Sequence, residues 1–279
     1  MASGPGFVKR KVGLWAVVAA WLSLLGVSPA RGQAPPEDSF DDSAYARVLE
    51  TFVTPEGQVR YAALKQDPAA LNAFLERLAA TSPESRPELF PTPAARMAYW
   101  INAYNAFVLD AVVEAYPIES VVSLRTLFGA LFFKRARFVA GGKKYSLDDI
   151  EHGILRRGFA DPRLHFALNC ASTSCPKLAP QPYRAETLEA QLEQAARRFI
   201  SREENVWMRG DVLFLSKIFA WYREDFLKAA PGGAGGTAGL VAYVLRYLPE
   251  ETAERVRQEK PRVEFYDYDW RLNDAARAD

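Results

Sequence analysis

Apolar residues recur at helical spacing along most of the chain, in segments separated by turns that contain proline or glycine. The longest segment runs from Thr92 to Tyr116: the threonine can cap a helix, Pro93 fits its first turn and Pro117 ends it. The middle of this segment is apolar nearly all round, which is typical of a buried helix. Further helices are predicted at 43–53, 66–80, 184–201 and 237–248, and in "KIFAWYREDFLKA", which Ser216 can cap.

Short strands interrupt the helical pattern. Residues 136–147 alternate around a Gly-Gly turn, which is typical of a β-hairpin. Ser146 and Asp149 then form a capping-box pattern for a helix that carries His152 and ends near a glycine at 158. The segment "DPRLHFALNC" predicts a turn followed by a strand that ends at Cys170, and "DVLFLS" predicts another strand.

The order of these elements predicts one mainly helical α+β domain with a small sheet or hairpin. The glycine-rich connector at 231–236 is too short to separate two large domains. Composition agrees with this interpretation, because 279 residues with 49% hydrophobic and 25% charged content are ordinary for a soluble globular protein. The net charge of +1 predicts neither a nucleic-acid partner nor an anionic membrane partner.

The first forty residues follow a different pattern. A basic cluster at Lys9–Lys11 precedes an apolar run from Val12 to Val27, and small residues follow it. This order is typical of a secretory signal peptide, and the run is shorter than the roughly 20 residues of a spanning helix. We expect an exported protein, periplasmic or extracellular, whose mature chain has no membrane segment; an uncleaved N-terminal anchor is the alternative. The expected boundaries are 1–34 for the signal peptide, 35–44 for a flexible leader, 45–273 for the globular domain and 274–279 for a tail.

The chain has only two histidines and two cysteines, and all four lie between residues 152 and 175. One interpretation is a nucleophilic site in which Cys170 is the thiolate and His165 or His152 is the base. In an unbroken strand Cys170 would share the apolar face with Leu164, away from His165. The interpretation therefore requires the chain to turn at Asn169 or Cys170, and the Ala-Ser-Thr-Ser sequence that follows favours such a turn.

Other polar residues could complete this site. Asn102 and Asn105 lie on one face of the buried helix, and an unpaired buried amide costs about 1–3 kcal/mol. We therefore expect these amides either to hold loop backbone or to line the site, where they or Asp149 could orient the imidazole or donate to an oxyanion. Glu151 is a further candidate that could pair with His152, although contact with water is the simpler interpretation.

Three alternatives to a nucleophilic site remain open. Export permits a structural disulfide between Cys170 and Cys175. A zinc ion could bind His152, His165, Cys170 and Cys175, but their spacing fits none of the familiar ligand pairs, so no cofactor is the primary expectation. Both thiols could also be buried structural residues. In "FAWYREDF", finally, the aromatic residues are expected in the core and the three charged residues, Arg223, Glu224 and Asp225, in water.

Five motifs resemble those of the DUF547 family, over roughly residues 45–273: "YWINAYNAFVLDAV", "SLDDIEHGILR", "DPRLHFALNCASTSCP", "LSKIFAWYREDF" and "YDWRLN". The resemblance suggests an exported bacterial member and favours Cys170 over Cys175 as the reactive position, because some relatives have serine in place of the second cysteine. The family's motif residues correspond here to Asn102, Asn105, Glu151, His152, His165, Asn169, Cys170 and Cys175.

The resemblance implies no reaction, but the Cys/His pairing suggests a papain-like or transglutaminase-like core. Our hypothesis is a cysteine- and histidine-dependent hydrolase or acyltransferase that acts on an envelope or peptide-like substrate. The rival hypothesis is a non-enzymatic envelope binding or scaffold module in which a Cys170–Cys175 disulfide is structural.

Overall fold

Helix α4 (Pro93–Ala115) runs through the larger of two hydrophobic cores and confirms the predicted buried helix. The Thr92 hydroxyl accepts a hydrogen bond from the N–H of Ala95 at 3.1 Å, which caps the first turn. Nearly every side chain from Met97 to Val112 is buried, including the amides of Asn102 and Asn105. Other elements pack around this helix and position the candidate site.

The computed structural model describes residues 1–2, 4, 39–123, 132–135 and 137–277. Those from residue 39 onward belong to one compact unit, Pro35–Asp279. The predicted signal peptide lies almost entirely outside the described residues, so the expectation of export stays a prediction. Of the leader predicted at 35–44, residues 39–44 are described, and the last two of them belong to the first helix. No helix within the described ranges is both long enough and apolar enough to cross a membrane.

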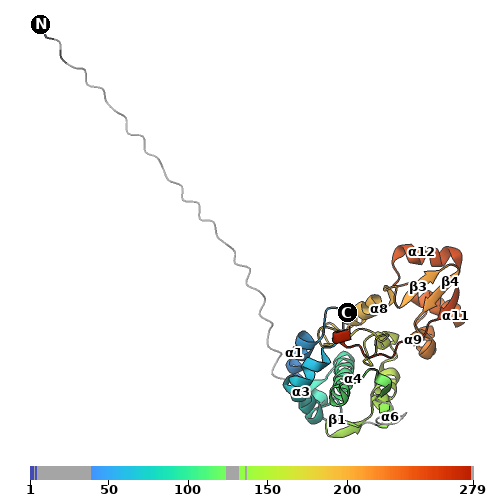
Figure 1. Cartoon of the computed structure of the whole chain (residues 1–279), viewed down its shortest axis with the longest axis horizontal. Helices are drawn as coiled ribbons and strands as arrows, with labels where there is room; N and C mark the ends of the chain where they lie inside the picture. The colour runs from blue at the N-terminus through green and yellow to red at the C-terminus, as the bar shows by residue number, and fades with distance from the viewer. Residues whose placement is uncertain (3, 5–38, 124–131, 136, 278–279) are drawn as a thin grey trace. The chain divides into compact units, whose positions relative to one another are not determined.

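The N-terminal helices pack against α4 in the first core (Figure 1). Two of them confirm the helices predicted at 43–53 and 66–80. A core of this kind forms because each helix presents a stripe of apolar side chains to its neighbours. The elements before the hairpin are α1 (Ser43–Phe52), α2 (Tyr61–Gln66), α3 (Ala69–Ala80), the 3-10 helix η1 (Pro87–Leu89), α4 and α6 (Phe132–Arg135).

The predicted hairpin is formed by β1 (Phe138–Ala140) and β2 (Lys143–Tyr145), which pair antiparallel. Gly141 has φ 54°, and a Cβ there would lie 2.3 Å from the Ser82 hydroxyl oxygen, so this turn position requires glycine. The predicted capping box follows: the Ser146 N–H donates to the Asp149 carboxylate at 2.9 Å, and the Asp149 N–H donates to the Ser146 hydroxyl at 3.0 Å.

The helix that follows the capping box is a π-helix, η2 (Asp149–Arg156), continued by a short α-helical turn, α7 (Arg157–Phe159). Sequence periodicity predicts a helix here but does not predict its π-helical winding. Such winding is rare and is frequent at functional sites. The helix ends at Phe159, as predicted near Gly158, and its C-cap Ala160 has a φ of 51°.

The prediction of a strand before Cys170 is wrong. Residues 162–166 form a 3-10 helix, η3 (Pro162–Phe166), capped by the Asp161 carboxylate, which accepts the N–H of Arg163 at 2.9 Å. Asp161 followed by proline is itself a helix-start signal, and it outweighs the short apolar run that suggested a strand. The two faces expected of a strand therefore do not exist, and Leu164, His165 and Phe166 are all buried.

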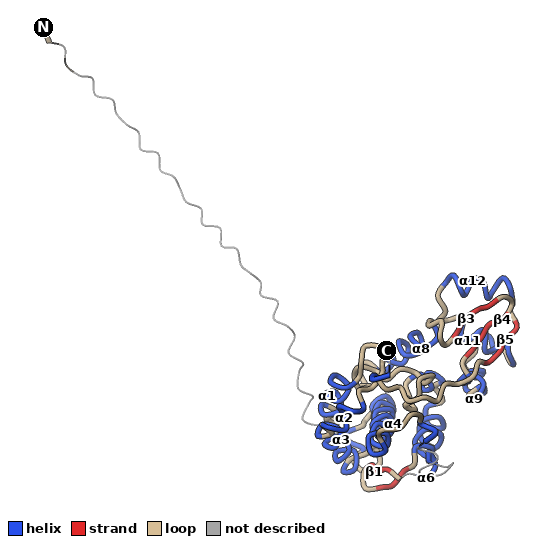
Figure 2. Tube along the Cα trace, in the orientation of Figure 1, coloured by secondary structure: helices blue, strands red, loops and turns tan. Residues whose placement is uncertain are grey.

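A second core surrounds a three-stranded sheet, which Figure 2 shows together with the last helices. Strands β3 (Val206–Arg209) and β4 (Val212–Leu215) pair antiparallel, whereas β4 and β5 (Arg262–Phe265) pair parallel. The Ser216 hydroxyl caps α9 (Lys217–Trp221) as predicted, and the predicted helix over 217–229 is broken at Tyr222. These elements are α8 (Leu188–Ile200), β3 (Val206–Arg209), β4 (Val212–Leu215), α9 (Lys217–Trp221), α10 (Arg223–Lys228), η4 (Pro231–Gly233), α11 (Gly236–Val244), α12 (Glu250–Glu259) and β5 (Arg262–Phe265).

The C-terminal segment returns to the first core and lies along the loop that contains the cysteines. The Asn273 N–H donates to the Ala171 carbonyl at 3.0 Å, and the Thr173 N–H donates to the Arg271 carbonyl at 2.8 Å. Asp274, the first residue of the expected tail, is buried, and η5 (Ala275–Arg277) follows it. Helices thus predominate over two small sheets, which confirms the mainly helical α+β fold predicted from the sequence.

Candidate active site

The chain turns sharply immediately after Cys170. Ala171 has φ 63°, a conformation that costs energy for a residue with a side chain and persists only when its surroundings enforce it. Asn169 enforces it: its Oδ1 accepts the N–H of Ala171 at 2.8 Å, and its Nδ2 donates to the Pro176 carbonyl at 2.7 Å. The turn that a nucleophilic Cys170 requires is therefore present.

The two buried asparagines of α4 hold loop backbone, which is the first of the two roles expected for them. Asn102 donates to the Tyr183 carbonyl at 2.8 Å and accepts the N–H of Tyr183 at 2.9 Å. Asn105 donates to the Ala167 carbonyl at 3.0 Å and accepts the N–H of Asn169 at 2.8 Å. Each amide thus binds backbone at both ends, and among the described residues neither is hydrogen-bonded to an imidazole.

Asp149 does not orient an imidazole either. Its carboxylate accepts the Ser146 N–H and pairs with Arg137 at 2.8 Å, at the start of η2. The N–H and hydroxyl of Ser146 hold the pKa of Asp149 below its usual range, and Arg137 adds to this effect. Asp149 is thus a capping residue of η2.

A cavity of about 370 Å³ lies between η2, η3, the cysteine loop, α9 and the C-terminal segment. Both histidines and both cysteines line it, as predicted from their clustering in the sequence. Its aromatic lining was not predicted as part of a site. The polar lining residues are Asp148, Glu151, His152, His165, Cys170 and Cys175, and the aromatic ones include Tyr104, Trp221, Tyr222, Tyr268 and Trp270.

Both thiols are free, and the Cys170–Cys175 disulfide is not formed in this structure. The Cys170 N–H donates to the Cys175 sulfur at 2.8 Å, while the Cys170 sulfur lies 3.2 Å from the Ser172 hydroxyl and 3.4 Å from the Tyr268 hydroxyl. Hydrogen bonding with Cys175, and then with Ser172 and Tyr268, lowers the pKa of Cys170 to about 7, although burial opposes this.

The environment of Cys175 has the opposite effect. Burial raises the pKa of Cys175 well above its usual range, and the neighbouring Cys170 raises it further. Near neutral pH Cys170 therefore ionises, whereas Cys175 remains a thiol. The difference between the pKa values of the two thiols gives a structural reason for preferring Cys170 as the reactive position.

His165 is paired with a carboxylate that sequence analysis placed in water. Its Nε2 lies 2.8 Å from Oδ2 of Asp225, and its ring stacks on Tyr222 with 3.7 Å between ring centroids. Burial lowers the pKa of His165, and the hydrogen bond to Asp225 only partly offsets this. His165, followed by Arg156, holds the pKa of Asp225 well below its usual range.

This pairing fixes the tautomer of His165. A neutral imidazole next to an ionised carboxylate donates through the nitrogen that faces it, so Nε2 carries the proton and Nδ1 carries the basic lone pair. Within the described residues, no hydrogen bond joins the Cys170 sulfur to either imidazole. Cys170 and His165 thus share a cavity but are not hydrogen-bonded to each other.

Arg156 links the two histidines. Its Nε donates to Asp225 at 2.7 Å, one of its terminal nitrogens lies 2.9 Å from Nδ1 of His152, and its guanidinium lies 5.1 Å from the Tyr222 ring centroid. His152 also lies 3.7 Å from the Asp148 carboxylate. The charged groups of η2 and α10 therefore form one connected network beside the cavity.

Glu151 neither faces water nor pairs with His152, so both interpretations offered for it are wrong. It is 9% exposed, and it accepts hydrogen bonds from the Tyr222 hydroxyl at 2.6 Å and the Tyr104 hydroxyl at 3.2 Å. Burial followed by the charge of Glu151 raises the pKa of both tyrosines, which therefore remain donors. A buried carboxylate with two phenol donors satisfies the requirement that buried charge be hydrogen-bonded.

Five residues that shape the site were not predicted from the sequence: Tyr104, Arg156, Tyr222, Asp225 and Tyr268. Tyr222 and Asp225 lie three apart in "LSKIFAWYREDF", a motif of the resemblance, and that spacing was the available signal. The zinc site considered from the sequence has no matching arrangement of ligands. Within the described parts of the chain, no group of three or more His, Cys, Asp or Glu side chains is arranged to hold a metal ion.

Comparison with known families identifies the region that carries most of this geometry. Residues 90–200 match a family described as "Protein of unknown function, DUF547". The matched range includes α4, η2, η3 and the cysteine loop, whereas Asp225 and Tyr268 lie beyond it. No curated protein and no solved structure matches the chain. The family match confirms, over residues 90–200, the resemblance to the DUF547 family that the sequence motifs suggested.

Proposed function

We propose that the protein is a cysteine-dependent hydrolase or acyltransferase with Cys170 as its nucleophile. The observation that carries the proposal is the environment of Cys170, a half-buried thiol that lines the cavity and has a pKa lowered to about 7. Reactive cysteines lie in environments that favour the thiolate and leave it accessible, whereas inert buried cysteines have raised pKa values. Cys175 matches the second description and Cys170 the first.

His165 is the general base and acid in this proposal, and it acts across one bridging water because no hydrogen bond joins the ring to the sulfur. Its Nδ1 takes the proton of the Cys170 thiol, and the thiolate forms a bond to the acyl carbon of the substrate. The bond from that carbon to the leaving group breaks, and the leaving group takes the proton from the imidazolium. Asp225 stabilises the imidazolium through Nε2.

The second half of the reaction releases the acyl group. His165 takes a proton from water, or from an alcohol or amine acceptor, and the resulting oxygen or nitrogen attacks the thioester. The carbon–sulfur bond breaks, Cys170 leaves as a thiolate, and the imidazolium returns its proton. Water as the attacking group gives a hydrolase, whereas an alcohol or amine gives an acyltransferase.

The substrate class follows from the cavity and from the N-terminal sequence. The cavity is of a size suited to a small molecule or to a short part of a larger one. Trp221, which is 49% exposed, stacks on Trp270 with 5.7 Å between ring centroids, and both line the cavity. Such rings bind flat amide or sugar-like groups, which favours a peptide-like envelope substrate. The signal-like run from Val12 to Val27 supports an exported location, which is also a proposal.

Acylation of the reduced protein by p-nitrophenyl acetate tests the proposal. We expect a burst of nitrophenolate and one acetyl group on Cys170, detected by peptide mass spectrometry. Asp225→Asn should slow the release of the acetyl group, whereas Asp267→Asn, which changes an exposed aspartate paired with Lys217, should not. Acetylation spread evenly over surface lysines, with none on Cys170, would contradict the proposal and favour a non-enzymatic binding module.

A further inference from the structure

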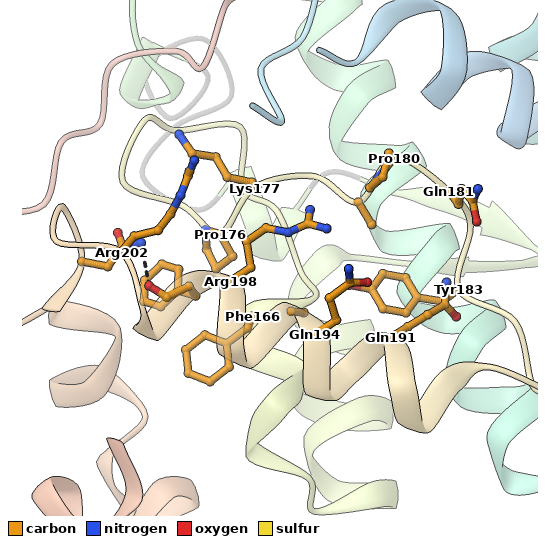
Figure 3. Close-up of a pocket in the computed structure, with 14 residues that line it drawn as sticks. Phe166, Pro176, Lys177, Pro180, Gln181, Tyr183, Gln191, Gln194, Arg198 and Arg202 are labelled. Carbon is orange, nitrogen blue, oxygen red and sulfur yellow. Dashed lines mark hydrogen bonds between the residues drawn. The ribbon is translucent and has the colours of Figure 1, made fainter. Parts of the chain in front are cut away.

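A second cavity, of about 280 Å³, lies between α8 and the segment 176–183 (Figure 3). Three cationic side chains line it: Lys177 from the loop, Arg198 from α8 and Arg202 just beyond that helix. No aspartate or glutamate is among its lining residues. A cavity whose charged groups are all positive attracts an anion, and its concave shape strengthens the local potential.

Two of the three cations in this cavity have no ion-pair partner among the residues that the structure describes. Neither Lys177 nor Arg198 forms a salt bridge with any other residue that the structure describes. Arg202 lies 3.1 Å from Glu204, but the Glu204 side chain is 57% exposed and does not line the cavity. Arg197, the neighbour of Arg198 on α8, is by contrast paired with Glu193 at 3.1 Å.

The cavity is separate from the thiol site, although the two share one wall. Pro176 lines both cavities, and the adjacent residues His165 and Phe166 line one cavity each. Phe166, Phe199 and Tyr183 give the cationic cavity an aromatic wall, and Gln194 adds an amide beside the charges. The lining therefore combines cationic, amide and aromatic groups.

We propose that this cavity binds a small phosphate-bearing molecule. Two guanidinium groups can each donate two parallel hydrogen bonds to phosphate oxygens, and an ammonium adds a further charge. Three cations are better matched by the double negative charge of a phosphate monoester than by the single charge of a carboxylate. The inference does not depend on the proposed acyl chemistry, because it rests on different residues and is measured by binding.

Calorimetric titration of the full chain with inorganic phosphate tests this inference, at an ionic strength held constant with chloride. Arg198→Gln should weaken binding about tenfold, because one charge-assisted pair is lost. Arg197→Gln is the matched control: it removes a neighbouring charge on the same helix, outside the cavity, and should change the affinity by less than about twofold. Lys177→Gln tests the site from the loop, independently of the stability of α8.

Several results would overturn the inference. These are the absence of phosphate binding by the wild-type chain, equal weakening by Arg197→Gln and Arg198→Gln, or retention of full affinity by both Arg198→Gln and Lys177→Gln. Titration with acetate tests the ligand class, because acetate carries one charge. Acetate that binds as tightly as phosphate would contradict the choice of a phosphate-bearing ligand.

Discussion

Nε2 of His165 and Oδ2 of Asp225 lie 2.8 Å apart, joining η3 to α10 across 60 positions of the chain. The same carboxylate oxygen accepts a hydrogen bond from Nε of Arg156 at 2.7 Å. The imidazole is buried and the carboxylate is half-buried, so their interaction is screened less by solvent than that of a surface pair. The pair holds the imidazole in one tautomer and connects η3 with α10.

His165 makes the protein less stable in mild acid. Its pKa is lowered by burial, so the unfolded chain, in which histidine titrates near about 6.5, takes up a proton more readily than the folded one. Its contribution to stability is therefore fully present above that pH and is lost as pH falls. We expect His165→Gln to flatten the decline in melting temperature between about pH 7 and pH 5.

The choice of glutamine leaves an amide donor near the position of Nε2, so that Asp225 keeps a partner. His152→Gln is the control, since it keeps the buried His165 ring and should retain the wild-type decline. Calorimetric melting temperatures at a series of pH values measure the effect. A decline as steep in His165→Gln as in the wild type would rule out His165 as its source.

Cys175 is expected to activate Cys170. Removing its thiol, in Cys175→Ala, takes away the largest effect that lowers the Cys170 pKa, while the opposing effect of burial remains. The pKa of Cys170 should therefore rise towards the usual thiol range, and alkylation by iodoacetamide at neutral pH should slow. The midpoint of the alkylation rate against pH measures the shift, with Cys170→Ser as the unlabelled reference. An unchanged midpoint would mean that hydrogen bonding with Ser172 and Tyr268 is sufficient to lower the pKa of Cys170.

Glu151 should contribute more to stability than any exposed glutamate. In Glu151→Gln the buried carboxylate that accepts two tyrosine hydroxyls becomes an amide, which accepts at only one of its two ends. We expect the free energy of unfolding to fall by about 1–3 kcal/mol, because one phenol donor loses its acceptor. Glu50→Gln, at an exposed position of α1, should change it by less than about 0.5 kcal/mol. Urea unfolding of both variants provides the comparison.

Asn169 is predicted to support both the fold and the reactivity of Cys170. Asn169→Ala leaves the Ala171 N–H and the Pro176 carbonyl without partners, which should cost about 2 kcal/mol or more and slow the alkylation of Cys170. Asn205→Ala is the control, since Asn205 is also a buried amide bonded to backbone, in this case to Phe199. It should lose stability and keep the wild-type alkylation rate; a parallel loss of rate in both variants would indicate general destabilisation.

Local signals predicted the parts of the fold that depend on neighbouring residues. The capped α4, the hairpin, the capping box before η2 and the Ser216 cap all follow from short-range chemistry, and all are present. The segment before Cys170 shows the limit of such signals. Its apolar run fits a strand, but Asp161 and the proline after it start a 3-10 helix, and the run is too short to decide between them.

The site could be predicted only in part for a similar reason. The clustering of histidines and cysteines in the sequence identified the cavity lining, because those residues are rare in this chain. Asp225 and Tyr268 were missed because each reaches the cavity through contacts between distant segments, which spacing along one segment does not reveal. Glu151 was misread because nothing in the sequence shows that two phenols would cover a glutamate next to a histidine.

The π-winding of η2 makes the site depend on segment length as well as on residue type. Two side chains five positions apart, Glu151 and Arg156, reach Tyr222 and Asp225, which lie three apart on a single turn of backbone. Between them, Gly153 has open space where a side chain would lie. A side chain at that position would therefore not disturb the packing. Deletion of the residue would instead change the winding of η2, and it would separate the Glu151–Tyr222 contact from the Arg156–Asp225 contact.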